Sequence, residues 1–593
     1  MCGIIAIAGK GAKKIDDAKL GAMLSCLSKR GPDDRGFERL SDECILGQTR
    51  LAIVDLSPAG HQPMHDNCDP LTVVFNGEIY GYKEARAELE RRGHTFSSHS
   101  DTEVILKAYA EYGRDCVKHL DGMFAFAIWD DRKKELFVAR DRFGKKPFYY
   151  SFSGTGSTAT FIAASEIKSI FATGLIKGKV DPEALDDYLR LMYIPSHKTV
   201  YSNVGMLPPA HAGIVKNGTL ETWRYWNLEK KELDITYDDA KARIKELFDE
   251  AVRKRMIADV EVGSLLSGGV DSTIVTMYAQ KYSSFPIKTF AVGYDGHKNE
   301  LPYALEASKK IGTDHYTLAV NADLAEELGK IIEYMDEPHG DTSNFPQQLI
   351  SGLAASKVKV ALTGDGADEL FMGYGWYQKK WHMPRWRLDW RLLNPFSAHQ
   401  KAITVFRTGE RRKLLRPSIS NDSEKTIERA ALSGLSDPIH KINAFDLKIY
   451  LPGQLLSKID RTSMMHSLEV RSPFLDTALA EFVYNLPTKY KLSKTQNKII
   501  LKDILSESFP KKFVYRRKQG FGAPVGIWLQ NEKMKALLDG LFSENNPGWK
   551  YLDRKAALRM KNRYYEGKRM SPNKLWVIAC LLLWFEKHAK YHE

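Results

Sequence analysis

Short runs of apolar or alternating residues, rich in Ile, Val and Phe, dominate the first part of the chain. Turn-forming residues bound these runs, a pattern that predicts β-strands, and longer stretches with helical spacing lie between them. Strands at this density, interrupted by helices, predict an α+β domain in which helices cover antiparallel sheet. The expected strands are 3–8, 51–56, 71–76, 123–129 and 135–140, and the expected helices are about 17–29, 83–92 and 102–114.

The pattern changes near residue 240, where strands and helices begin to alternate. Such alternation predicts right-handed β-α-β units and a parallel sheet, whose ligands bind beyond the carboxyl ends of the strands. After about residue 425 the pattern is mostly helical. The expected join is 202–235, which gives domains 2–215 and 236–593. Strands are expected at 260–266, 287–293, 314–320 and 358–363, with helices at 240–257, 272–282, 300–311, 322–335 and 345–355.

The composition is that of an ordinary globular protein. Of the 593 residues, 43% are hydrophobic and 27% are charged, which excludes a disordered or collagen-like chain. No apolar run approaches the ~20 residues that cross a bilayer, and the N-terminus lacks the basic segment of a secretory signal. The six cysteines are scattered without metal-binding spacing. We therefore expect a cytoplasmic protein without a membrane partner.

The net charge of +13 raises the question of an anionic partner. Basic residues gather at 379–391, where Trp alternates with Arg, and at 511–518. They could form a polyanion-binding patch, as in a nucleic-acid-binding or tRNA-modifying protein. They could instead form a solvated face, or an insertion whose aromatic side chains pack inward. We favour a solvated face or an inward-packed insertion over a binding patch, and we expect no nucleic-acid partner.

Cys2 is the first candidate for chemistry because it directly follows the initiator Met. Removal of Met would give Cys2 a free α-amine with a pKa of about 8, beside its own thiol with a pKa of about 8.5. One residue would then supply both nucleophile and base, as in N-terminal nucleophile enzymes. A cysteine at position 2 is by itself a weak signal, so the interpretation depends on the residues that follow.

Three later groups strengthen this interpretation. An Asn-Gly pair, here Asn76-Gly77, can aim a side-chain amide and a backbone N–H at one point, which is the geometry of an oxyanion hole. Arg50 can bind a carboxylate through two hydrogen bonds, and Asp101 can hold an ammonium. Together they would bind a free amino acid and expose its side-chain carbonyl to attack. Taken singly, Asn-Gly is a hairpin turn and Arg50 a surface charge.

A second candidate centre lies between a predicted strand and a predicted helix, in the sequence Ser267-Gly268-Gly269-Val270-Asp271-Ser272. The glycines let the backbone approach an anion, and the N–H groups that open a helix bind phosphate. Asp271 can hold Mg²⁺ on the phosphates. The sequence 363–369 (TGDGADE) follows another predicted strand and faces the same crevice, with Asp368 as a second Mg²⁺ candidate. The alternative for this acidic run is a favourable helix N-terminus.

The N-terminal motifs resemble the glutaminase domain of class II glutamine amidotransferases. This resemblance implies an αββα sandwich of the N-terminal nucleophile type, with Cys2 as the nucleophile and Asn76 and Gly77 as the oxyanion hole. It also implies a glutamine site formed by Arg50, Leu51, Ala52, Ile53, Val54, Asn76, Gly77, Glu78 and Asp101. The motifs are Met1-Cys2-Gly3-Ile4, Arg30-Gly31-Pro32-Asp33, His61-Gln62-Pro63, Asn76-Gly77-Glu78 and 141–147 (DRFGKKP).

The Ser267–Ser272 sequence resembles the pyrophosphate loop of ATP pyrophosphatases, and both halves in this order resemble glutamine-hydrolysing asparagine synthetases over at least residues 1–530. Further matching stretches are 457–464, 469–476 and 517–521. The resemblance implies that Lys518 neutralises charge on the phosphates and carboxylate. Asp365 stands where some members carry Glu, at a position linked to acyl-adenylate formation. The implied ATP site comprises Leu266, Ser267, Gly268, Gly269, Asp271, Ser272, Val292, Thr363 and Gly364, and the implied Mg²⁺ ligands are Asp271 and Asp368.

The resemblance implies asparagine synthesis from aspartate, glutamine and ATP with Mg²⁺, through a Cys2 thioester, channelled ammonia and β-aspartyl-AMP. It also implies a homodimer. The nearest alternative keeps this machinery and changes the acceptor to another carboxylate, such as a uronic acid or a secondary metabolite, because nothing in the sequence isolates an aspartate-specific pocket.

Overall fold

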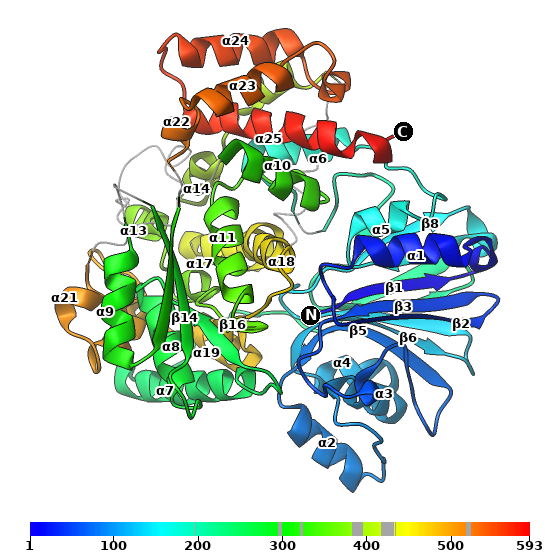
Figure 1. The fold of residues 1–593 in the computed structure, drawn as a ribbon. Coiled ribbons are helices and arrows are strands. Elements are labelled where there is room, and N and C mark those ends of the chain that lie inside the picture. The colour runs from blue at the N-terminus through cyan, green and yellow to red at the C-terminus, as the bar shows by residue number, and fades with distance from the viewer. Residues whose placement is uncertain are drawn as a thin grey trace.

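Two sheet-based parts lie side by side, and a helical cap covers one end of both (Figure 1). The structure is a computed structural model. It describes residues 1–195, 197–294, 299–320, 324–381, 395–416, 432, 434–516 and 524–593.

The N-terminal part is a sandwich of two antiparallel sheets. The strand orders are β10-β8-β9-β1-β3-β2 and β12-β11-β7-β6-β5-β4. The first sheet contains β1 (Gly3–Ala8), β2 (Asp34–Ser41), β3 (Cys44–Arg50), β8 (Tyr149–Ser153), β9 (Thr160–Ala164) and β10 (Gly205–Met206). The second contains β4 (Met64–His65), β5 (Leu71–Ile79), β6 (Gly122–Asp130), β7 (Glu135–Arg140), β11 (His211–Lys216) and β12 (Thr219–Arg224).

Alternation along β1 explains how helices enclose this sandwich. Ile4 and Ala6 pack between the sheets, whereas Ile5 and Ile7 face the opposite way, because successive strand side chains point to opposite faces. The outward side chains contact helices, which completes the expected αββα arrangement (Figure 1). The helices of this part are α1 (Asp17–Cys26), α2 (Tyr82–Arg91), α3 (Asp101–Tyr112), α4 (Cys116–His119), α5 (Ile167–Phe171) and α6 (Pro182–Leu191).

The strand expected at 51–56 is wrong. Strand β3 ends at Arg50, and the residues that follow are irregular. The Arg50 guanidinium donates hydrogen bonds to the carbonyl oxygens of Val54 (3.2 Å) and Asp55 (2.5 Å), and Asp55 has a positive φ of 53°. A segment folded around the Arg50 side chain cannot present its carbonyls to a neighbouring strand, so the ladder stops.

The second part contains the expected parallel sheet, with strand order β15-β14-β13-β16-β17. Helices α7 and α8 cover one face, and α11 and α18 cover the other. The strands are β13 (Val262–Leu265), β14 (Lys288–Tyr294), β15 (Asp314–Val320), β16 (Val360–Leu362) and β17 (Glu469–Arg471). The helices are α7 (Tyr237–Arg255), α8 (Val270–Gln280), α9 (Leu301–Ile311), α10 (Leu324–Tyr334), α11 (Asn344–Ala355), α12 (Ala367–Leu370) and α18 (Ser457–Met464).

The rest of the chain is helical, as expected. A π-helix, η5 (Asp446–Leu456), leads directly into α18, and the long buried helix α25 anchors the C-terminal cap against α10. The predicted domain limits, 2–215 and 236–593, stay a prediction. Among the described residues, the remaining helices of four or more residues are α13 (Gly375–Trp381), α14 (Pro395–Ile403), α15 (Thr408–Leu414), α17 (Pro438–Phe445), α19 (Thr477–Asn485), α20 (Ile499–Ser506), α21 (Lys511–Val514), α22 (Val525–Trp528), α23 (Glu532–Leu541), η8 (Pro547–Lys550), α24 (Arg554–Tyr565) and α25 (Pro572–His588).

Buried charged side chains join the two sheet-based parts. Arg30 of the N-terminal part donates two hydrogen bonds to Asp460 of α18, at 2.8 and 3.0 Å. Arg461 pairs with Glu166 (3.2 Å) and Asp336 (3.0 Å). Each of these side chains is almost completely buried, so each charge depends on a partner from the other part of the molecule or from a neighbouring element.

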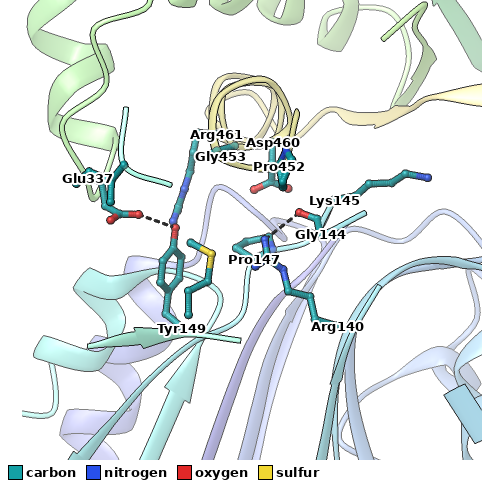
Figure 2. A pocket seen from close by; sticks show the side chains of 13 residues that line it. Arg140, Gly144, Lys145, Pro147, Tyr149, Glu337, Pro452, Gly453, Asp460 and Arg461 are labelled. Carbon is teal, nitrogen blue, oxygen red and sulfur yellow. Dashed lines mark hydrogen bonds between the residues drawn. The ribbon is translucent and has the colours of Figure 1, made fainter. Parts of the chain in front are cut away.

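A small cavity of about 20 Å³ lies at this junction (Figure 2). Arg140 and Tyr149 line it from the N-terminal part, and Glu337, Gly453 and Asp460 line it from the second part. The Tyr149 hydroxyl donates a hydrogen bond to Glu337 (3.2 Å), as Figure 2 shows. A volume of this size holds about one water molecule, so a molecule of that size fits between the two parts.

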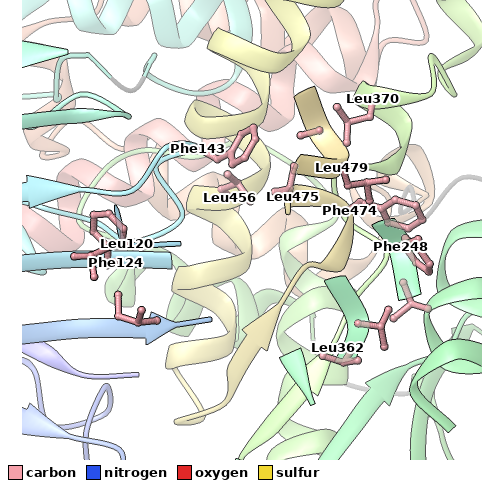
Figure 3. Close-up of a cluster of buried hydrophobic side chains, with 14 of the residues drawn as sticks. Leu120, Phe124, Phe143, Phe248, Leu362, Leu370, Leu456, Phe474, Leu475 and Leu479 are labelled. Atoms are coloured by element: carbon pink, nitrogen blue, oxygen red, sulfur yellow. The ribbon is translucent and has the colours of Figure 1, made fainter. Parts of the chain in front are cut away.

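One hydrophobic core also continues across the junction (Figure 3). Phe124 and Phe143 of the N-terminal part belong to the same buried cluster as Leu456 and Phe474 of the second part. The interface therefore combines apolar packing with buried ion pairs. Among the helices that the structure describes, none is long and apolar enough to cross a bilayer.

We predict that Arg30→Met lowers the free energy of unfolding by about 3–5 kcal/mol, because Asp460 would lose its bidentate partner in a buried setting. The matched control is Arg39→Met, which removes an ion pair with Asp17 at the protein surface and should cost under ~1 kcal/mol. Thermal unfolding followed by calorimetry measures both. Equal midpoints for the two variants would contradict a structural role for the Arg30–Asp460 pair.

Candidate functional site

The structure brings Cys2 and Asn76 together, although they lie far apart in the sequence. The backbone N–H of Cys2 donates a hydrogen bond to Asn76 Oδ1 at 3.0 Å, and Arg30 Nε donates to the Cys2 carbonyl oxygen at 3.1 Å. Asn76 is completely buried in β5, and its Nδ2 has no partner among the described residues. A buried amide donor beside a thiol is available to an oxyanion.

Gly77 is required by the close approach of β6. A Cβ at this position would lie 2.0 Å from the carbonyl oxygen of Met123. The absence of a side chain lets β5 and β6 pair through Gly77↔Phe124 directly beside Asn76. The backbone geometry at the predicted oxyanion hole therefore depends on glycine.

The predicted glutamine-site carboxylates also lie at this end of β5. Asp101 opens α3 and accepts a hydrogen bond from the Ile79 N–H at 2.9 Å, while Glu78 pairs with Arg471 of β17 at 2.9 Å. Burial raises the pKa of Asp101 to about 6. Burial also raises the pKa of Glu78, and the Arg471 guanidinium opposes that shift.

Arg50 and the segment 51–54 lie near Cys2. Burial raises the pKa of the Cys2 thiol. A hydrogen bond from the Leu51 backbone and the positive charge of Arg50 each lower this pKa. Ala52 N–H donates to Asp33 (2.8 Å), and the Ile53 carbonyl accepts from Asp259 N–H (2.9 Å). Val54 is buried, and its carbonyl accepts from Arg50.

Met1 is present in the structure and occupies a buried position. Its terminal ammonium pairs with Glu469 of β17 at 3.0 Å, and its sulfur contacts the Lys146 ammonium. In this form the nitrogen of Cys2 belongs to a peptide bond, so it is not a base. The expected α-amine of Cys2 therefore stays a prediction that requires removal of Met1.

The second centre is the turn between β13 and α8. Gly268 has a φ of +72°, and a Cβ there would lie 2.4 Å from the Tyr303 carbonyl carbon. Ser272 Oγ accepts a hydrogen bond from Ser267 N–H at 3.2 Å, which folds the turn over the start of the helix. The helix N-cap is Gly269. Because glycine has no side chain, it does not cap the N–H groups of the first helical turn. This arrangement suits a phosphate.

The loop after β16 lies against this turn. A Cβ on Gly364 would be 2.8 Å from Asp271 Cβ, so glycine permits the contact. The Thr363 hydroxyl donates to Asp365 Oδ2 at 2.6 Å, and burial raises the pKa of Asp365. Leu266 directly follows β13, and Val292 lies near the end of the neighbouring strand β14. The Leu266 N–H donates to the Phe290 carbonyl at 2.8 Å.

Asp271 and Asp368 meet at Lys498, which the sequence analysis did not single out. The Lys498 ammonium lies 2.6 Å from Asp271 Oδ2 and 2.6 Å from Asp368 Oδ1. Among the described residues, no cluster of three or more His, Cys, Asp or Glu side chains could hold a metal. Mg²⁺ commonly uses one or two carboxylates together with substrate phosphates, and these two carboxylates fit that requirement.

Lys518 lies outside the described residues, as do residues 382–391 of the Trp/Arg segment. The described end of the same basic stretch reaches the second centre. Arg516 Nη2 donates to the Gly268 carbonyl at 2.9 Å, and Trp376 Nε1 donates to Asp446 at 3.2 Å. These two side chains pack against the protein, and the interpretation of residues 379–391 stays a prediction.

Sequence reasoning did not assign roles to Arg30, Glu469 or Arg471. A signal was present in Glu469-Val470-Arg471, where two charged residues flank Val in a short strand, and all three are buried. Buried strand charges need partners, and the N-terminal part supplies one to each: the Met1 ammonium to Glu469 and the Glu78 carboxylate to Arg471.

Comparisons with known proteins match both halves of the chain. A family model described as glutamine amidotransferase domain matches residues 1–226, and one described as asparagine synthase matches residues 243–586. Glutamine-hydrolyzing asparagine synthetase 3 of Bacillus subtilis is 32% identical, over 84% of this chain and 83% of its own. Glutamine-hydrolyzing asparagine synthetase 1 of the same species is 28% identical, over 98% and 96%. Amidase chry2 of Gibberella zeae is 27% identical, over 86% and 85%.

We predict that Lys498→Met raises the affinity of the protein for Mg²⁺ by roughly 10-fold or more, because Asp271 and Asp368 would lose the cation that compensates their charges. Isothermal titration calorimetry measures this affinity. The matched control is Lys502→Met, one turn further along α20, whose ammonium binds the Asn497 side chain instead. Equal Mg²⁺ affinities in the two variants would contradict a divalent-cation site at these carboxylates.

Proposed function

The chain belongs to the asparagine synthase family and is a ligase with a glutamine amidotransferase domain, and from this premise we propose that it makes asparagine from aspartate, glutamine and ATP. The observation that carries the proposal is the pairing of two centres in one chain. Cys2 lies beside the free amide donor of Asn76, and the Ser267–Ser272 turn lies beside the Asp271–Lys498–Asp368 cluster.

In the N-terminal centre, Cys2 Sγ attacks the side-chain carbonyl carbon of glutamine. The thiol proton passes to the α-amine that removal of Met1 exposes, and from there to the departing ammonia. Asn76 Nδ2 and the Gly77 N–H donate to the oxyanion. Arg50 binds the substrate carboxylate, while Glu78 and Asp101 bind its ammonium. Water then cleaves the thioester and releases glutamate.

In the second centre, a side-chain carboxylate oxygen of aspartate attacks the α-phosphorus of ATP. The bond between the α-phosphorus and the bridging oxygen breaks, and pyrophosphate leaves from the Ser267–Ser272 turn. Asp271 and Asp368 would hold Mg²⁺, which supplies positive charge to the phosphates. Lys518 adds a further positive charge that neutralises charge on the phosphates and the carboxylate. Asp365 takes part in the formation of β-aspartyl-AMP.

Ammonia then joins the two reactions. It attacks the acyl carbon of β-aspartyl-AMP, which yields asparagine and AMP and releases a proton. Free ammonia in neutral water is mostly ammonium and is not nucleophilic, so a dry passage preserves its reactivity. The cavity of about 20 Å³ between the two parts supports such a passage because it admits a molecule the size of water. The cytoplasmic location and the homodimer stay predictions.

The alternative function uses the same chemistry on another carboxylate acceptor. The similarity to amidase chry2, at 27% identity over 86% of this chain, favours keeping it. Incubation with glutamine, ATP, Mg²⁺ and a panel of carboxylates, followed by mass spectrometry of the amide products, separates the two. Amidation of aspartate in preference to the other carboxylates supports asparagine synthesis, and amidation of a different carboxylate establishes the alternative.

We predict that Cys2→Ala abolishes glutamine-dependent synthesis and preserves synthesis driven by added ammonia, because the thiol serves only the first centre. The matched control, Cys68→Ala, changes an exposed cysteine and should keep both activities. Amide product is measured with each nitrogen source. Loss of the ammonia-driven reaction in Cys2→Ala would refute this division, and intact-mass analysis establishes whether Met1 is removed.

We predict that Asp271→Asn and Asp368→Asn each reduce ATP/pyrophosphate exchange at least ~100-fold, because each removes a charge that the Mg²⁺-pyrophosphate group requires. Glutamine hydrolysis should stay nearly unchanged. Asp249→Asn, which alters an exposed carboxylate paired with Lys281, is the control. Normal exchange in both variants would remove these carboxylates from the metal site.

A further inference from the structure

Arg471 is a single residue that touches both centres. Its backbone carbonyl accepts a hydrogen bond from Thr363 N–H at 2.9 Å, in the loop assigned to ATP. Its side-chain Nη2 donates to Glu78 Oε2 at 2.9 Å, in the site assigned to glutamine. One residue of β17 therefore connects the nucleotide loop directly to a carboxylate of the glutamine site.

The remaining contacts of Arg471 fix this position. Nε donates to Glu469 at 2.7 Å, and Nη1 donates to the carbonyls of Arg255 (2.9 Å) and Ile257 (2.7 Å). Arg471 is completely buried. All three nitrogens of the guanidinium therefore have partners, and the planar fork cannot turn toward Glu78 or away from it without breaking bonds to the second part.

We propose that Arg471 is a positioning residue that couples nucleotide binding to glutamine binding. Binding of ATP at the Thr363–Asp365 loop stabilises the backbone bond to Arg471, and this holds β17 in the register in which the guanidinium orients Glu78 for the substrate ammonium. Glutamine is then bound more tightly while an acceptor can be activated. This inference rests on the proposed function.

The chemistry of the pair explains why Arg is needed. Glu78 is buried, and a buried carboxylate binds an ammonium only when it stays ionised, which a neighbouring cation favours. Lysine would keep the positive charge. Its single ammonium cannot reproduce the fork that bonds Glu78, Glu469 and two carbonyls at once. Arg471→Lys should therefore preserve the positive charge and lose the simultaneous bonds to Glu78, Glu469 and the two carbonyls.

The test measures the KM for glutamine hydrolysis with and without saturating α,β-methylene ATP, Mg²⁺ and aspartate. The methylene bridge prevents cleavage, so only binding is varied. We expect the nucleotide to lower KM by about 5-fold or more in the unaltered protein, the lower end of common coupling energies. In Arg471→Lys we expect this factor to fall below about 2-fold.

The matched control is Arg253→Lys. Arg253 also crosses from the second part to the N-terminal part, where it pairs with Glu84 at 3.1 Å, but it contacts neither Glu78 nor Thr363. It should keep the full coupling factor. A purely structural role for Arg471 would instead lower kcat or stability without changing the ratio of the two KM values.

Hydrogen exchange on the unaltered protein gives a second measurement that does not depend on a folded variant. Bound α,β-methylene ATP should increase protection in peptides covering 76–80 and 469–471, and leave the peptide around Glu84 unchanged. Unaltered KM and unaltered protection in a protein that hydrolyses glutamine and exchanges pyrophosphate would overturn the coupling alone. Full coupling in Arg471→Lys would also overturn it. A protein without glutamine hydrolysis would overturn both the coupling and the proposed function.

Discussion

The structure depends on charged side chains that cross the domain interface without contact with water. Arg30 and Asp460 form a bidentate pair although 430 residues separate them in the sequence, and Arg471 reaches Glu78 from the other direction. An unpaired charge at such a depth costs several kcal/mol. The two halves are therefore held in the arrangement in which both ion pairs form at the same time. This arrangement fixes the position of Cys2 relative to the nucleotide loop.

Glycine provides the second constraint, because both centres require the backbone to approach a neighbour closely. Gly77 lets β5 meet β6 beside Asn76, and Gly364 lets the loop after β16 meet Asp271. Each glycine belongs to a motif that also carries a reactive side chain. The local sequence thus specifies the contact and the chemistry together, which explains why these motifs are informative even without a structure.

The sequence predicts what local periodicity and motifs encode. It predicts the β13–α8 turn and the parallel sheet, because each depends on short spacing. It predicts Asn76 as a neighbour of Cys2 from motifs that resemble those of a known family. It misplaces a strand at 51–56, since the Arg50 side chain competes for the carbonyls that a strand would offer. It assigns no role to Lys498 or Arg471, because Asp271, a partner of Lys498, and Glu78, a partner of Arg471, lie more than 200 residues away from them. Such pairings follow from tertiary packing alone.

The character of the interface bears on the space between the two parts. A purely apolar interface tolerates sliding, whereas buried ion pairs have few satisfactory arrangements. The cavity at the junction is lined by Arg140, Glu337 and Asp460 and holds about one water-sized molecule. The same charges that cost free energy to bury therefore line a narrow space between the two parts, and this gives the chain a physical reason to retain them in place of an apolar interface.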